Sequence, residues 1–209
     1  MSCVFETVTY KGHAIELIQD KDAENPRTSF DNVGEILYTS SRYTLGDRRV
    51  DSNTIREITE RDDVIFLPVY AYIHGCTRLS TGSWRGRAQH AGWDSGQCGI
   101  IWCPKDKAVK EWGKKLCTKS VIEKAKKCLE GEVETYDQWI NGKVVGYSVE
   151  GPLCDDSCWG YYPDEKGNYD YPIDEAKSMI RYARNKEAKR LREERRQRAE
   201  LKEAVYALL

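Results

Sequence analysis

The sequence lacks any apolar run as long as the roughly 18 residues that a membrane-spanning helix requires. Its first residues, Met1 to Glu6, also lack the basic and apolar segments of a secretory signal peptide. Internal repeats and low-complexity linkers are missing as well. These absences predict a cytosolic globular chain with no membrane partner.

Metal-binding patterns are weak among the eight cysteines. Cys98 and Cys103 are an odd number of residues apart on a predicted strand and are therefore expected to point to opposite faces. Cys154 and Cys158 lack the two-residue gap of a zinc knuckle. In a cytosolic chain we expect these side chains to be reduced thiols in apolar surroundings rather than disulfides.

Histidine is scarce, with three residues in the whole chain. His74 and Cys76 are expected to share a strand face, with His90 as a third neighbour, but the sequence indicates no fourth ligand. None of the histidines lies in a known catalytic pattern. We therefore predict no metal site, no cofactor and no catalytic residue, and these patterns do not support an enzyme.

The sequence motifs of phosphate-binding and calcium-binding loops are incomplete in this chain too. The glycines at 92, 96 and 99 are followed by neither Lys-Ser nor Lys-Thr. Asp20, Asp22 and Glu24 have a calcium-like spacing, but Asn25 stands where that loop needs glycine. Turn formation and capping account better for these acidic residues.

Charge is balanced over the whole chain but not along it. The 33 Lys and Arg against 34 Asp and Glu give a formal net charge of -1, which predicts no general attraction to nucleic acid. Residues 174 to 209 carry 11 basic and 7 acidic side chains, a local charge of +4, so the remainder has 22 basic and 27 acidic, or -5. The C-terminal segment is therefore the candidate surface for an anionic partner.

The apolar patterns predict an α+β fold, with a mainly antiparallel sheet, flanking helices and a long basic C-terminal helix. Strands are predicted at 4–10 and 14–19, joined into an opening hairpin by Lys11-Gly12, and at 34–39 and 64–73, with a distortion of the last one at Pro68. A helix is predicted at 51–60, capped by Ser52 or Asn53, and another from a capping box at Ser120 to a C-terminal cap at Gly131. Strands at 132–140 and 143–149 are predicted to flank Asn141-Gly142, which favours a type I′ hairpin turn.

We expect residues 1–171 to form the α+β domain and residues 172–209 to form the long helix. Unbroken, about 36 residues would make a helix of about 54 Å. The side chains predicted to dock its first part on the domain are Ile173, Ala176, Ile180 and Ala183.

The middle of that helix is strongly charged, with eight basic and four acidic residues from Arg184 to Glu200. The spacing predicts ion pairs of Glu187 with Arg190, Glu193 with Arg196, and Glu194 with Arg198. The basic residues outside these pairs are Arg184, Lys186, Lys189, Arg192 and Arg195. Two interpretations stay open, a solvated salt-bridged arm and a surface for phosphates or an acidic protein.

Aromatic residues in glycine-rich loops are the other candidates for contact with a partner. Ala91 to Cys103 is a glycine-punctuated loop that runs into an apolar strand, and glycine and tryptophan together shape a surface rather than a reaction centre. Tryptophan and arginine are also the residues that anchor interfaces most often. The candidate partner-binding residues are Trp84, Arg85, Arg87, Trp93 and Trp159.

A series of short motifs follows in order along the chain. They are Asn25-Pro26-Arg27, Phe30 to Gly34, Arg42 to Asp47, Leu67 to Tyr70, Trp93 to Gly99, Tyr136 to Trp139 and Asp156 to Tyr162. Over roughly residues 13 to 180 the chain thereby resembles an uncharacterised family of small proteins encoded by tailed bacteriophages and mobile elements. The resemblance implies a genetic setting and no mechanism, and it carries no catalytic residue over to this chain.

Three functions are consistent with these features. The first is a non-enzymatic binding protein that engages a host protein in the host cytosol and inhibits antiviral defence. The alternative is nucleic-acid binding through the basic C-terminal helix and the Arg85 and Arg87 loop. The third is binding or cleavage of a nucleotide-like small molecule by an aromatic pocket near Trp93 and Trp102. The identity of the partner and the oligomeric state stay open.

Overall fold

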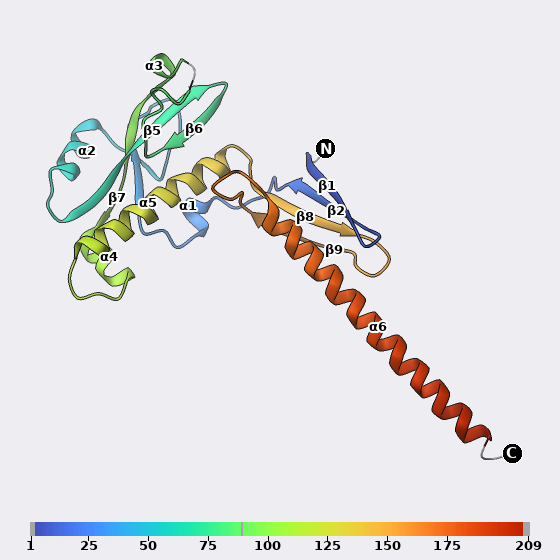
Figure 1. Cartoon of the computed structure of the whole chain (residues 1–209). Coiled ribbons are helices and arrows are strands. Elements are labelled where there is room, and N and C mark those ends of the chain that lie inside the picture. The colour runs from blue at the N-terminus through green and yellow to red at the C-terminus, as the bar shows by residue number, and fades with distance from the viewer. Residues whose placement is uncertain (1–2, 89, 207–209) are drawn as a thin grey trace. The chain divides into compact units, whose positions relative to one another are not determined.

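The computed structural model describes residues 3–88 and 90–206 of the chain. The chain divides into two compact units, which we call unit 1 (residues 1–22 and 144–209) and unit 2 (residues 23–143). Both units combine strands with helices, so the chain has the α+β fold that the sequence predicts (Figure 1).

A five-stranded sheet forms the centre of unit 2, in the order β4-β3-β7-β5-β6. β3 and β4 pair in parallel, and the other neighbours are antiparallel. The long apolar run that predicts a strand is β5, which lies inside the sheet between β7 and β6. The strands are β3 (Glu35–Tyr38), β4 (Arg48–Arg49), β5 (Val64–His74), β6 (Cys76–Ser80) and β7 (Ser95–Pro104).

A bulge interrupts the pairing of β5 with β7. The register shifts between Val69 and Tyr70, which leaves Cys98 as an extra residue on β7. The distortion expected at Pro68 therefore falls just after it. Because the bulge breaks the alternation of β7, Cys98 packs on the same core cluster as Cys103, and the prediction that the two thiols point to opposite faces is wrong.

Helices cover both faces of this sheet (Figure 1). The helices of unit 2 are α1 (Pro26–Ser29), α2 (Ser52–Thr59), α3 (Ala91–Asp94), α4 (Lys105–Glu111) and α5 (Lys119–Ile140). Ile100 and Ile101 are neighbours on β7 and point to opposite faces. Ile101 packs with Leu129 of α5, and Ile100 packs with Ile58 of α2.

Residues 132–140 are the last part of α5, so the prediction of a strand there is wrong. Gly131 does not end the helix. The buried side chains Leu129, Val133 and Tyr136 continue the helical spacing through it. A glycine inside a helix costs about 1 kcal/mol, and the burial of this apolar face outweighs that cost.

Asn141-Gly142 ends α5 and does not form the predicted hairpin turn. Asn141 is the C-cap, and Gly142 follows at a φ of 62°. The N–H groups of Gly142 and Lys143 donate to the carbonyls of Trp139 and Gln138, at 2.9 and 3.0 Å. In this C-terminal motif a glycine at positive φ allows the last helical carbonyls to be satisfied.

The N-caps also differ from the predicted ones. The carboxylate of Asp51 caps α2, in place of Ser52 or Asn53. The hydroxyl of Thr118 caps α5, in place of Ser120. In both helices the residue that caps is the earlier one with a side-chain oxygen able to accept from a first-turn N–H.

Unit 1 contains an antiparallel four-stranded sheet. Its strands, in sheet order, are β1 (Val4–Tyr10), β2 (His13–Gln19), β8 (Val145–Glu150) and β9 (Asp156–Tyr161). The predicted opening hairpin is confirmed, and it turns at Lys11 and Gly12, which both have positive φ. β8 was expected to pair with 132–140 and pairs instead with β2 and β9.

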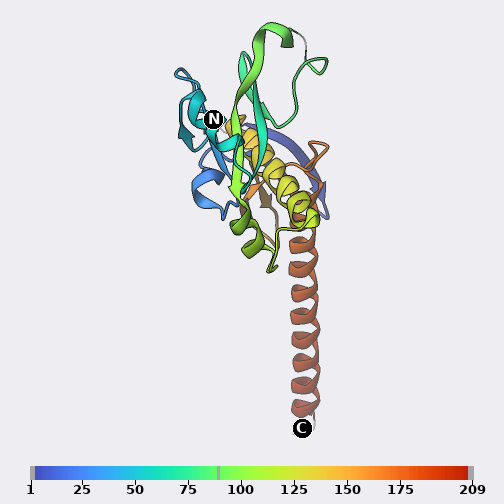
Figure 2. The same cartoon turned by 90° about the vertical axis from the view of Figure 1, so that its left-hand side faces the viewer.

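The long C-terminal helix is α6 (Asp170–Tyr206). Its first part docks on the sheet of unit 1 as predicted, with Ile173, Ala176 and Ile180 buried beside Leu17. The 37 residues of α6 correspond to about 55 Å, and the helix continues unbroken past its own sheet (Figures 1 and 2). No described helix has an apolar stretch long enough to cross a membrane.

Candidate functional site

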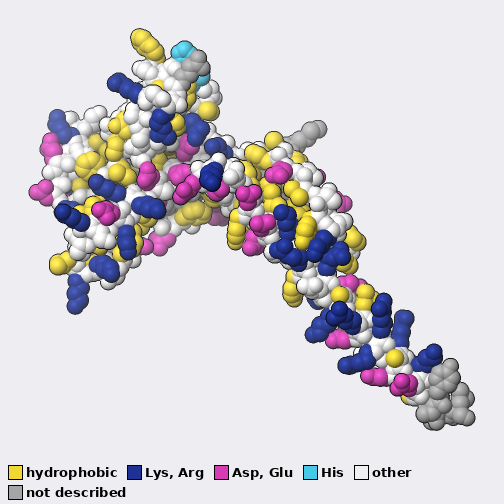
Figure 3. Space-filling view, in the orientation of Figure 1, with side chains coloured by type: hydrophobic (Ala, Val, Ile, Leu, Met, Phe, Trp, Pro, Cys, Tyr) yellow, Lys and Arg dark blue, Asp and Glu magenta, His cyan; other side chains and the backbone are white. Residues whose placement is uncertain are grey.

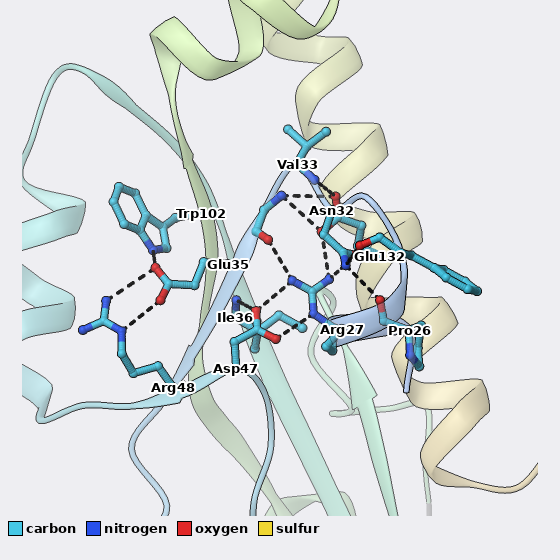
Figure 4. A network of polar contacts seen from close by, with 12 residues as sticks. Pro26, Arg27, Asn32, Val33, Glu35, Ile36, Asp47, Arg48, Trp102 and Glu132 are labelled. Atoms are coloured by element: carbon cyan, nitrogen blue, oxygen red, sulfur yellow. Dashed lines mark hydrogen bonds and ion pairs between the residues drawn. The ribbon is translucent and has the colours of Figure 1, made fainter. Parts of the chain in front are cut away.

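Arg27 is the centre of a buried polar network in unit 2 (Figure 4). Its guanidinium donates to both carboxylate oxygens of Asp47, at 2.9 and 2.7 Å, and to Glu132 at 2.9 Å. It also donates to Asn32 and to the carbonyl of Gly34. Burial lowers the pKa of Arg27, and the hydrogen bonds with Asp47 and Glu132 outweigh this effect and raise it. This buried arginine therefore stays charged and organises the motif residues around it.

The network positions the segment that follows β3. The N–H of Ile36 donates to Asp47 at 2.7 Å, and the N–H of Asp47 donates back to the carbonyl of Ile36 at 2.9 Å. These contacts hold residues 42–47 against β3. The same segment supplies Tyr43 and Leu45 to the wall of a pocket.

The pocket opens where β3 ends and β7 continues. The last pair between these strands is Tyr38 with Gly99, whereas β7 begins at Ser95. The space measures about 430 Å³, which is within the range of sites that hold a small ligand or a partner's side chain. Its lining includes Tyr43, Leu45, Ala71, Ile73, Trp93 and Asp94.

Sequence reasoning found Trp93 but missed this pocket, because its walls come from segments far apart in the chain. One signal was available in Leu45-Gly46-Asp47. A Cβ on Gly46 would lie 2.3 Å from Cγ2 of Ile36, so only glycine fits there. A glycine of this kind beside a carboxylate indicates a loop held tightly against a strand, and that loop forms the pocket wall.

Trp93 is the most exposed large apolar side chain that the structure describes, at 93%. It lies in α3, a single helical turn, and His90 enters that turn in the left-handed region at a φ of 59°. Ala91 in the same turn is buried. The turn is therefore anchored on one side and presents the indole of Trp93 on the other.

Asp94 joins this turn to the end of β5. Its Oδ2 lies 2.9 Å from Nδ1 of His74. The ring of His74 stacks on His90 and on Tyr72, with ring centroids 6.0 and 6.1 Å apart. Side chains from β5 and from the α3 segment thus form a row of rings beside Trp93.

Trp84 extends the row and is half-buried, which differs from the exposed anchor that we expected. Its ring packs on Tyr72 at 5.8 Å, and its Nε1 donates to the carbonyl of Tyr70 at 3.4 Å. The guanidinium of Arg87 lies over the indole at 5.0 Å, and both Arg85 and Arg87 are exposed. Trp84 and Arg87 therefore support the row, and Trp93 is the side chain that a partner can reach.

The pocket contains a thiol, Cys98, that stays protonated. Burial raises its pKa to about 12. Its Sγ donates to the carbonyl of Val69 at 3.4 Å. A thiol with this pKa carries almost no thiolate near neutral pH. Cys98 therefore shapes the pocket and does not act there as a nucleophile.

Metal-ligand geometry is also missing from the part of the chain that the structure describes, where no three His, Cys, Asp or Glu side chains are grouped to hold an ion. His74 and Cys76 flank the turn at Gly75 between β5 and β6. The arrangement around Trp93 offers a shaped apolar space, a row of rings and one His–Asp contact. These features suit recognition of a partner.

Trp102 lies away from the pocket. Its Nε1 donates to the carboxylate of Glu35 at 3.1 Å, and Arg48 pairs with the same carboxylate at 2.9 Å (Figure 4). Along β7, Ser95 and Trp102 are about 23 Å apart. The structure therefore does not bring Trp93 and Trp102 together into one aromatic pocket.

Trp159 belongs to unit 1, where it lies on the edge strand β9 and is 47% exposed. Its ring lies over Gly146 of β8, where a Cβ would be 2.2 Å from the indole. Trp159 therefore packs on its own sheet and is not carried on a loop. The tryptophans proposed as anchors are divided between the units, with Trp84 and Trp93 in unit 2.

The exposed part of α6 segregates its charges, and its basic side chains are visible along the helix in Figure 3. At about 100° per residue, one side of the helix carries within an arc of about 120° the residues Arg181, Arg184, Arg192, Arg195 and Arg198. The other side carries, within about 140°, the residues Glu187, Glu193, Glu194 and Glu200, whereas Glu203 lies beyond the distal end of the first set and about 20° from the direction of Arg192. We call the first set the arginine stripe.

The five basic residues that sequence reasoning selected do not share one side of α6. Arg184, Arg192 and Arg195 belong to the arginine stripe. Lys189 lies about 60° outside it, and Lys186 lies on the opposite side. All five are exposed.

Two of the three predicted ion pairs on α6 are wrong. Arg190 pairs with Glu187, as predicted, and also with Glu194, both at 2.7 Å. Arg196 pairs with Glu200 at 3.4 Å and not with Glu193. Arg190 donates to the carboxylates of both Glu187 and Glu194, so Glu194 pairs with Arg190 and not with Arg198 of the stripe.

Comparison of the chain with protein-family models, curated proteins and solved structures found no match. Two surfaces of the described residues are candidates for function, the Trp93 pocket of unit 2 and the arginine stripe of unit 1.

Proposed function

We propose that unit 2 binds a host protein through Trp93 and the pocket beside it, without catalysing a reaction. The observation that carries this proposal is the 93% exposure of Trp93 on a turn that Ala91 anchors and the Asp94–His74 contact restrains. Burying one tryptophan removes about 150–250 Å² of surface. At about 25 cal/mol/Å² this corresponds to about 4–6 kcal/mol before the costs of association.

The pocket supports recognition of a protein because it adds shape to that anchor. Hot spots in interfaces are aromatic side chains that sit beside a pocket and pair with a complementary group of the partner. The apolar Leu45, Ala71 and Ile73 line the space next to Trp93. We propose that a side chain of the partner enters this space while Trp93 is covered.

The partner is proposed to be a component of host antiviral defence that is inhibited by the binding. The support for this part is the resemblance of the motifs to those of a phage-encoded family. A small phage protein without catalytic machinery acts on its host by occupying a host surface. Inhibition is tested directly by assaying the captured partner with and without the full chain.

The test compares Trp93→Ala with Leu116→Ala in a pull-down from nuclease-treated bacterial host lysate. Leu116 is also in unit 2 and is 74% exposed, because it lies beyond the end of α4 at Glu111. We expect the wild type and Leu116→Ala to retain one host protein in stoichiometric amount, and Trp93→Ala to lose it. Equal retention by both variants, or no protein that survives nuclease, contradicts the proposal.

A further inference from the structure

We infer from the charge pattern of α6 that the arginine stripe binds double-stranded nucleic acid along one phosphate backbone. This function goes beyond the protein binding proposed for unit 2 and does not depend on it. Its basis is the segregation of charge along a helix that continues past its own sheet.

The stripe presents uncompensated positive charge. Within the described residues, no carboxylate forms an ion pair with Arg184, Arg192 or Arg195. Arg190, on the other side of the helix, is neutralised by Glu187 and Glu194. The acidic residues of α6 therefore cancel the basic residues of their own side and leave the stripe free to bind anions.

The turn between β1 and β2 extends the stripe at its proximal end. Arg184 Nη1 donates to the carbonyl of Lys11 at 3.3 Å. The exposed ammonium of Lys11 lies over the ring of Tyr10, 5.3 Å from its centroid. A further cation thus stands beside the point where α6 leaves the sheet.

The one-sided pattern decides how a duplex would lie on the helix. From Arg181 to Arg198 the stripe measures about 26 Å, less than one turn of B-DNA at about 34 Å. A helix inside the major groove has phosphates on both sides. There the carboxylates of Glu193 and Glu200 would face the second backbone. The stripe therefore fits along one backbone from outside, where it contacts phosphates and reads no bases.

Two features favour a duplex over a single strand. Proteins that bind single strands stack bases on aromatic side chains, and the arginine stripe includes no aromatic residue, because the exposed Tyr182 lies on the opposite side of α6. A duplex also carries more charge, about one per 1.7 Å of its axis. The small side chain of Ala188 within the stripe leaves room for close approach of the backbone. The same high charge density favours a duplex over an acidic protein as the occupant of the stripe.

The test measures the affinity of the full chain for a random-sequence duplex of about 30 base pairs and for one of its strands, by fluorescence anisotropy between about 50 and 200 mM salt. The test variant is Arg192→Gln with Arg195→Gln. The matched control is Lys186→Gln with Lys189→Gln, which removes the same charge from exposed residues of the same helix that lie outside the stripe. Circular dichroism and melting confirm that each variant keeps its helix.

We expect the wild type to bind the duplex more tightly than the strand. The stripe variant should bind at least about tenfold more weakly at low salt, with a salt slope smaller by about 2. The control should match the wild type. Trp93→Ala should bind the duplex unchanged, which separates this inference from the function of unit 2.

Four results would overturn the inference. Equal loss in the test variant and the control would mean that net charge acts without the stripe. Equal affinity for strand and duplex would show that the stripe does not recognise the geometry of a duplex. Displacement of the duplex by an equal charge of poly-L-glutamate would identify an acidic protein as the occupant. Absence of binding at low salt would exclude nucleic acid altogether.

Discussion

Oδ2 of Asp94 lies 2.9 Å from Nδ1 of His74, and this contact joins the turn that carries Trp93 to the end of β5. Both side chains are partly exposed, so the contact adds about 0.2–1 kcal/mol. Its importance is orientation, because a partner that meets an ordered indole does not have to order it.

Asp94→Ala is expected to weaken binding of the partner by about two- to fivefold, since it releases the turn without removing Trp93. The melting temperature should fall by no more than about 4 °C. Asp63→Ala is the control, because Asp63 also forms an exposed pair, with Arg61, elsewhere in unit 2. Affinity measured by calorimetry for both variants decides the matter. A loss as large as that of Trp93→Ala would show that Asp94 itself contacts the partner.

Arg27→Met is expected to destabilise unit 2 by about 2–3 kcal/mol, because it removes the hydrogen bonds of a buried guanidinium and leaves the carboxylates of Asp47 and Glu132, which are 21% and 11% exposed, without a counter-charge. Denaturant unfolding measures the loss. Arg48→Met removes an arginine whose pair with Glu35 is exposed, and should cost about 1 kcal/mol or less. Similar losses in the two variants would mean that the Arg27 network is not what holds this part of the fold.

Gly131→Ala is expected to stabilise the protein by about 0.5–1 kcal/mol. A Cβ on Gly131 would meet no atom within 4 Å, and alanine is the better helix former. Gly142→Ala should destabilise it, because Gly142 has a φ of 62°. The denaturant midpoints of the two variants, at unchanged slope, give the sign of each change in the unfolding free energy. Destabilisation by Gly131→Ala is expected only if α5 ends at Gly131, whereas Gly142 needs a positive φ both in a C-cap and in a hairpin turn.

Stability is expected to fall as pH rises above about 8.5, the ordinary pKa of a thiol. Burial raises the pKa of Cys98 to about 12, and of Cys103 and Cys128 to about 11. In the window between these values the unfolded chain has lost its thiol protons and the folded chain has kept them. The folded state binds more protons, so each thiol lowers the unfolding free energy by about 1.4 kcal/mol per pH unit.

Urea unfolding between about pH 7 and 10.5 under reducing conditions measures this decline. Cys98→Ala should make it shallower, because one buried thiol no longer contributes. Cys76→Ser changes an exposed thiol and should leave the decline as it is in the wild type. A decline of equal slope in all three proteins would show that these thiols do not cause it.

Parts of the fold with a local signal were predictable from the sequence. The alternation of Val4 to Tyr10 and the Lys11-Gly12 turn predicted the first hairpin. The apolar run from Val64 predicted β5. The spacing of Ile173, Ala176 and Ile180 predicted how α6 docks. In each case the apolar pattern and the turn residues favour the same structure.

The end of α5 was not predictable from its local signal, because two structures share it. Asn141-Gly142 suits a type I′ turn and a helix C-cap equally, since both require positive φ. The apolar residues from Val133 to Ile140 decide between them through their helical spacing. That spacing counts only if Gly131 is allowed inside the helix, at a cost that the packing of α5 on the sheet offsets.

At the candidate site, the sequence predicted the exposure only of residues that do not contact distant segments of the chain. Trp93 is exposed as expected because its turn projects from the end of β7. Trp84 is not, because Tyr72 of β5 and Arg78 of β6 pack against it from outside its own loop. The pocket wall at Leu45 depends on the Arg27 network. Contacts between distant segments leave no periodic pattern in the sequence that reveals them.

The unbroken course of α6 ties the direction of each side chain to the number of residues before it. One extra alanine between Arg184 and Arg192 would turn the distal arginines by about 100° away from the proximal ones, with no change in charge. Seven extra residues would restore the alignment to within about 20°. The number of residues in α6 therefore sets the direction of each distal arginine. A change in that number alters the charged surface that a partner contacts more than the loss of a single charge does.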